Sequence, residues 1–137
     1  MLYSKQITVS ANTTEANSSK TRFKVNRGIV YRCWLSFPPG CVGLVKLRIL
    51  HEGHPFIPIE ANAYIRGDDY VFELPMFYEI TEEPQLITVE VWNEDDTYEH
   101  TVDVMLLILP KEFVLPVGAT EGIMKSLSSL IINRPII

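Results

Sequence analysis

Apolar and polar residues alternate with a period of two through most of this 137-residue chain, from Tyr3 to Leu109. Such a period places successive side chains on opposite faces of an extended strand, so that one face is buried and the other exposed. Proline, glycine and asparagine interrupt the pattern at short intervals, as turns require. The pattern predicts an all-β fold, an antiparallel β-sandwich or jelly-roll-like barrel of seven or eight strands with a C-terminal extension.

The expected strands cover residues 3–11, 22–25, 29–37, 44–50, 56–59, 70–74, 85–92 and 98–109. We expect the first two to pair with each other, and Pro58 marks 56–59 as an edge strand because proline lacks a ladder donor. Residues 75–84 are predicted to form an irregular connection in which Phe77 and Ile80 anchor the core. The pattern of 85–92 leaves open which set of side chains faces inward.

The apolar content of 47% suffices for one continuous core without disulfides or metals. We expect a β-sandwich domain over 1–112 and a C-terminal arm over 113–137. Cys33 and Cys41 have no partner at metal-ligand spacing and are predicted to be free, buried thiols, with a bridge across the Pro-Pro-Gly turn as the alternative. Trp34 and Trp92 are expected in the core, with sugar-stacking platforms as the alternative.

Charge is distributed unevenly along the chain. Residues 1–50 carry eight Lys or Arg and one acidic residue, whereas residues 51–112 carry fifteen acidic and two basic residues. The net charge of −5 argues against nucleic-acid binding, which needs a basic surface. Two hypotheses follow: basic and acidic strands neutralise each other within one fold, or a basic face of one subunit docks on an acidic face of the next.

The C-terminal arm differs from the rest because its apolar residues follow a helical spacing. Thr120 could cap a short helix there. Burying each large apolar side chain would contribute roughly 1.5–3 kcal/mol, either against the chain's own sandwich or against a neighbouring subunit. The predicted subunit-interface residues are Ile123, Leu127, Leu130, Ile131, Ile136 and Ile137.

The sequence contains no recognisable motif for catalysis, cofactor binding or metal binding. His51 and His54 lie in a Gly-Pro turn without a third ligand, so we expect surface histidines. The acidic turns at 68–69 and 94–96 lack the ligand pattern of a calcium loop and are predicted to be solvated. No nucleophile elbow or phosphate-binding glycine loop is present, which predicts a protein that is not an enzyme.

Targeting signals are also absent from the pattern. The first residues lack a basic segment followed by an apolar one, and the longest apolar run, 104–109, is too short to span a bilayer. We therefore expect synthesis in a cytoplasm and no membrane partner.

Two segments, 35–44 (LSFPPGCVGL) and 92–101 (WNEDDTYEHT), show the most evident resemblance to known proteins. In general terms over about residues 5–110, the chain resembles small proteins encoded among the structural genes of tailed phages. This resemblance implies a capsid decoration, or cement, protein: a β-rich subunit, often trimeric, that clamps the outer surface of an icosahedral capsid with its terminal arms. The expected function is thus a virion structural protein on the outer capsid surface, with the major capsid protein and copies of itself as partners. The alternative is a carbohydrate- or ligand-binding β-sandwich module.

Overall fold

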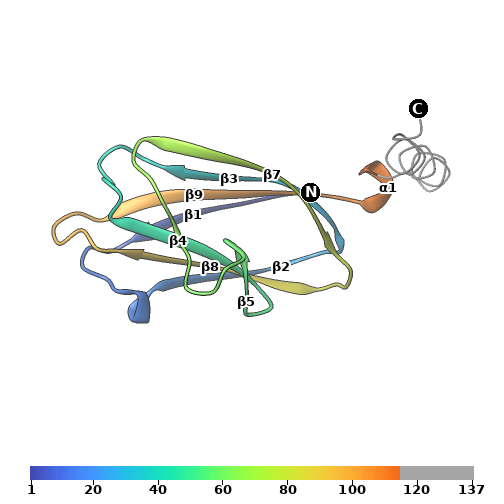
Figure 1. Ribbon diagram of the computed structural model, residues 1–137, viewed down its shortest axis with the longest axis horizontal. Helices are drawn as coiled ribbons and strands as arrows, with labels where there is room; N and C mark the ends of the chain where they lie inside the picture. Colours follow the sequence, from blue (N-terminus) through green and yellow to red (C-terminus); the bar gives the residue numbers. More distant parts are fainter. Residues whose placement is uncertain (115–137) are drawn as a thin grey trace, which may run out of the picture.

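The computed structural model describes residues 1–114 as two packed antiparallel β-sheets (Figure 1). Sheet A has the strand order β1-β9-β3-β7, and sheet B has the order β2-β8-β4-β5 with β6 also paired to β4. The strands are β1 (Leu2–Val9), β2 (Ser19–Val25), β3 (Gly28–Phe37), β4 (Val45–His51), β5 (His54–Ile57), β6 (Ile65–Arg66), β7 (Tyr70–Ile80), β8 (Gln85–Asn93) and β9 (His100–Leu109). A 3₁₀ turn, η1 (Glu15–Asn17), precedes β2, and a single helical turn, α1 (Lys111–Val114), follows β9. The predicted all-β sandwich is confirmed.

The strands pair as in one long hairpin that has been rolled up. Apart from the two-residue β6, the first strand pairs with the last, β2 with β8, β3 with β7, and β4 with β5. Two further pairs, β3 with β9 and β4 with β8, join these hairpin pairs into two continuous sheets. This nested order is the jelly-roll arrangement.

The prediction that the first two strands pair with each other is wrong. β1 pairs with β9 and β2 with β8, so the two early strands lie in different sheets. They do meet across the open side of the sandwich, where the rings of Tyr3 and Phe23 stack with centroids 5.9 Å apart. Local alternation predicts that a strand exists, but its partner depends on pairing between segments that are distant in the sequence.

The inward faces of both sheets form one apolar core. In β4, Val45, Leu47 and Ile49 are fully buried, as their alternation predicts. Both cysteines are buried within this core and are free. The other core residues are Ile7, Val9, Val25, Val30, Leu35, Phe37, Phe56, Ile57, Ile80, Ile87, Val89, Val91, Val102, Val104, Leu106 and Ile108.

Strand β8 is buried on both faces, which explains why its pattern did not reveal an inward set. Ile87, Val89 and Val91 face the core, whereas Thr88, Glu90 and Trp92 alternate with them and are nevertheless buried. β8 lies between β2 and β4, so neighbouring side chains cover its outer face.

Strand β7 continues through the segment that we expected to be irregular. Pro75 interrupts the sequence pattern, yet β7 is the edge of sheet A, and there a missing donor costs no ladder hydrogen bond. The pairing of β3 with β7 shifts its register between Val30 and Arg32, where β7 passes Pro75. Ile80 anchors the core as predicted, but Phe77 does not, since it points outward and is 58% exposed.

Close backbone contacts hold together the end of the sandwich where β1 begins and β9 ends. A side chain at Gly28 would place its Cβ 2.6 Å from the carbonyl oxygen of Leu109, so only glycine allows β3 to begin there. The amide of Ile108 donates to the carbonyl of Met1, which places the N-terminus beside α1 (Figure 1). The predicted boundary at 112/113 falls inside α1, and most of the predicted arm lies outside the described residues.

Candidate functional site

The predicted subunit-interface residues Ile123, Leu127, Leu130, Ile131, Ile136 and Ile137 all lie outside the described residues. The candidate site is therefore built from the surfaces of residues 1–114.

Ion pairs join many of the basic residues of the first half to acidic residues of the second. Arg48 on β4 pairs with Glu90 on β8 at 2.6 Å, and also with Glu15 of the first half at 2.8 Å. Lys46 pairs with Glu94, and Arg32 on β3 pairs with Glu73 on β7. These pairs support the first charge hypothesis, neutralisation between neighbouring strands of one fold.

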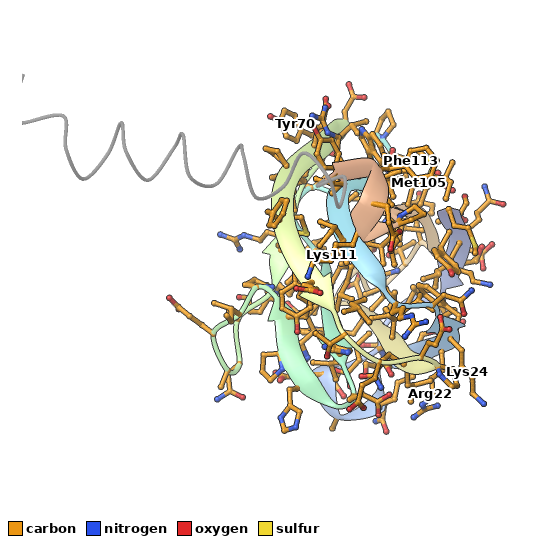
Figure 2. The ribbon with its side chains drawn as sticks, turned by 90° about the vertical axis from the view of Figure 1, so that its right-hand side faces the viewer. Arg22, Lys24, Tyr70, Met105, Lys111 and Phe113 are labelled. Atoms are coloured by element: carbon orange, nitrogen blue, oxygen red, sulfur yellow. The ribbon has the colours of Figure 1, made fainter. Side chains whose placement is uncertain are left out.

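A short basic row stays exposed on the outer face of β2. Lys20, Arg22 and Lys24 alternate with inward-facing residues, and within residues 1–114 we find no ion pair that they make. Figure 2 shows Arg22 and Lys24 at the margin of the sandwich. Since β2 is an edge strand, such charges also discourage edge-to-edge pairing with other chains.

The His51–His54 turn serves the fold rather than a metal. The two nitrogens of His51 lie 2.7 Å from the Tyr78 hydroxyl and 2.9 Å from Oε1 of Gln85. This half-buried side chain therefore links β7 of sheet A to sheet B, so the expectation of a surface histidine is wrong for His51, although His54 is exposed. Within residues 1–114, no group of three or more His, Cys, Asp or Glu is placed to hold a metal ion.

The acidic hairpin between β8 and β9 is also partly structural. Asp95 is buried and accepts hydrogen bonds from His100 at 2.8 Å and from the amides of Thr97 and Tyr98. The His100 bond, together with these amides, lowers the pKa of the Asp95 carboxyl. The expectation of a wholly solvated turn is wrong at Asp95, because folding closes the hairpin around its carboxylate.

Neither cysteine is placed as an activated nucleophile. Burial raises the pKa of the Cys33 thiol to about 12. Burial, with the nearby carboxylates of Asp68 and Asp95, raises the pKa of Cys41 to about 11. Both thiols are therefore protonated near neutral pH, the opposite of what a thiolate nucleophile requires.

The outer face of sheet A is the surface that the fold leaves open. The strand register aligns its outward side chains in rows: Leu2, Leu107, Arg32 and Pro75 form one row, and Ser4, Met105, Trp34 and Glu73 form the next. A third row contains Gln6, Asp103, Ser36 and Val71. The first row is mostly apolar and the third mostly polar, so the face has two distinct halves.

The half beside the chain termini is an apolar surface that we call the terminal patch, formed by Leu2, Phe77, Leu107, Leu109 and Phe113. Leu2 and Phe77 are more than half exposed, and Phe113 is 79% exposed. Figure 2 looks onto this end of the sandwich and shows Phe113 and Lys111 on α1. Leu107 and Leu109 are half-buried between them on β9.

The other half of the face is hollowed around Trp34. A depression of about 280 Å³ is lined by Ser4, Trp34, Ser36, Val71, Asp103 and Met105. We expected Trp34 in the core, but β3 turns its side chain outward, and only Trp92 of the two tryptophans is fully buried. The period-two pattern of β3 already placed Trp34 opposite Cys33 and Leu35, a signal that its aromatic character obscured.

A larger hollow of about 540 Å³ lies at the end of the sandwich, between the β2–β3 and β7–β8 connections and α1. Four of its charged side chains pair with each other: Arg27 with Glu83, and Lys111 with Glu79. The outer face of sheet A, whose Asp103 has no such partner among the described residues, is therefore the better candidate.

Comparisons with known proteins add no family. No protein-family model and no curated protein matches the chain. Among solved structures, PirA is similar over 77% of this chain and 94% of its own, with 14% sequence identity and a TM-score of 0.43. A resemblance at this level bears on neither the fold nor the function. No helix within residues 1–114 is long and apolar enough to cross a membrane.

Proposed function

We propose that the protein is a virion structural subunit, a capsid decoration protein that stabilises a shell through contacts between subunits. The observation that carries the proposal is the exposed terminal patch on sheet A. Leu2, Phe77 and Phe113 present large apolar side chains to solvent at one end of the sandwich. Several large apolar side chains exposed at one end of a globular protein are typical of a contact with another protein.

The position of this patch favours a contact made together with the C-terminal segment. The chain leaves the described fold at Val114, directly beside Phe113. The residues that follow include the apolar series from Ile123 to Ile137. We propose that the patch and this apolar series contribute to one interface with a neighbouring subunit or with the major capsid protein.

The fold class is compatible with this role. Jelly rolls occur in viral capsid and lectin domains, although a fold by itself does not determine a function. The buried thiols, with pKa values raised to about 12 and about 11, further support a role without nucleophilic catalysis. A closed ring of copies, for which we favour a trimer, would cover the apolar surfaces without forming open fibres.

The test is the mass in solution of the full chain and of variants in the terminal patch. Light scattering should give a defined multiple of the 15.6 kDa chain, three for a trimer. Phe77→Lys and Leu107→Lys should shift the mass toward one chain, because a buried lysine at the contact would be desolvated without a partner.

Tyr98→Lys is the matched control, since Tyr98 is 68% exposed and lies in the β8–β9 hairpin away from the patch. Its mass should equal that of the unmodified chain. A full-length chain that stays monomeric at every concentration, or patch variants that assemble normally, would contradict the proposal.

A further inference from the structure

The depression around Trp34 combines an aromatic ring with polar side chains that have no partner within residues 1–114. The side chains of Ser4, Ser36 and Asp103 make no hydrogen bond or ion pair that we find within residues 1–114. The neighbouring charges differ, because Arg32 and Glu73 on the same face bind each other. Among the described residues, Asp103 therefore offers two acceptor oxygens beside an indole ring.

The strand register brings these groups within reach of one small ligand. Trp34 pairs with Met105, and Ser36 pairs with Asp103, so the indole and the carboxylate lie diagonally across adjacent strands. Diagonal neighbours on one face of a sheet are about 7–8 Å apart, a separation that long and aromatic side chains span. Ser4 lies directly opposite Met105 on the other flank, and Val71 opposite Ser36.

This set of groups matches the surface of a sugar ring. The faces of a pyranose present C–H groups that pack on an aromatic ring, while its rim presents hydroxyls that need donors and acceptors. Trp34, Met105 and Val71 supply the apolar contacts, and Asp103 and the two serines supply the polar ones. A volume of about 280 Å³ is at the lower limit of ordinary ligand pockets, which suits one or two sugar units.

We propose that this depression is a binding site for a neutral saccharide. A neutral sugar is favoured over an acidic one, because the Asp103 carboxylate would repel a second negative charge in the depression. The site is independent of the proposed role in assembly, because Phe77 and Phe113 of the terminal patch do not line it.

The experiment titrates the full chain with glucose, galactose, mannose and N-acetylglucosamine, with N-acetylneuraminic acid as the acidic comparison. The readout is NMR, from the indole N–H of Trp34 and the methyl groups of Met105 and Val71. Trp92 serves as an internal reference because it is 1% exposed. At least one neutral sugar should shift the Trp34 and Met105 signals, with a Kd on the order of 1 mM for so shallow a site.

Three variants separate binding from folding. Asp103→Asn keeps the shape of the side chain and should weaken binding at least tenfold, and Trp34→Ala should abolish it. Tyr98→Ala removes an aromatic ring that is more exposed than Trp34 and lies outside the depression, so this variant should bind as the unmodified chain does. Ser36→Ala should weaken binding less than Asp103→Asn, since it removes one neutral hydrogen-bonding group.

The proposal fails if no neutral sugar shifts the Trp34 signal, or if Asp103→Asn binds as tightly as the unmodified chain. It also fails if Trp34→Ala lowers the mass of an oligomer while no sugar binds, a result that assigns Trp34 to a protein contact. Loss of assembly in the Phe77 and Leu107 variants with sugar binding retained would leave this site intact.

Discussion

The two outer faces of the sandwich differ in what covers them. On sheet B, the Trp92 ring is 1% exposed, because the Arg48 guanidinium lies 5.2 Å from its centroid and Tyr64 packs edge-on at 5.7 Å. On sheet A, Trp34 lines an open depression and Phe77 is more than half exposed. One chain thus covers one tryptophan with its own side chains and leaves the other available.

The difference shows how charge and packing act together. On sheet B, Arg48 both covers Trp92 and pairs with Glu90, so charged side chains complete the fold. On sheet A, a comparable carboxylate, Asp103, has no cation beside it among the described residues. We infer that the region of sheet B around Trp92 is structural, and the outer face of sheet A is the surface for which we propose a binding role.

The largest expected effect compares the two tryptophans directly. Trp92→Ala should lower the free energy of unfolding by about 3–5 kcal/mol, because it empties a fully covered site on sheet B. Trp34→Ala should lower it by a smaller amount, roughly 1–2 kcal/mol, because its side chain is only partly buried. Urea denaturation followed by circular dichroism measures both values. Equal losses of unfolding free energy would show that the two tryptophans are equally covered, contrary to the prediction.

A smaller effect compares the two carboxylates. Glu90→Gln should lower the free energy of unfolding by about 1.5–3 kcal/mol, because it weakens a charged hydrogen bond to Arg48 at a buried position. Asp103→Asn should change it by no more than about 0.5 kcal/mol. Denaturation midpoints of the two variants, measured side by side, test the prediction; a large loss in Asp103→Asn would give that residue a structural role.

The smallest effect concerns the hairpin that joins the two sheets, and it depends on pH. The hydrogen bond from His100, with those from Thr97 and Tyr98, holds the pKa of Asp95 below its ordinary value. Its stabilisation is therefore present above the unfolded-state pKa, about 4, and is lost as the pH falls through the lower folded-state pKa.

Asp95→Asn should accordingly be less stable than the unmodified chain at pH 7 and should lose less stability between pH 4 and pH 3. Thermal denaturation across this range measures the difference. Asp96→Asn is the control, because Asp96 is exposed and should leave the pH profile unchanged. Identical profiles for the Asp95 variant and the unmodified chain would rule out this linkage.

The amino-acid sequence was sufficient to predict the fold class, most of the strands and the inward position of Cys33. These properties follow from local alternation, because a period of two defines the inward face of a strand wherever the other face is open. The same alternation placed Trp34 on the outer side of β3, although its aromatic character suggested the core. The interruption at Pro75 was misleading, because a proline ends a central strand but is tolerated in an edge strand.

The edge position of β5 agrees with the prediction made for residues 56–59, but the strand partners and the coverage of outward side chains emerged only from the fold. β1 and β2 look like partners in sequence, yet each pairs with a strand at the other end of the chain. Trp34 and Trp92 lie in similar apolar strands, but only Trp92 has Arg48 and Tyr64 above it. Coverage of this kind depends on residues distant in sequence, and local periodicity carries no information about them.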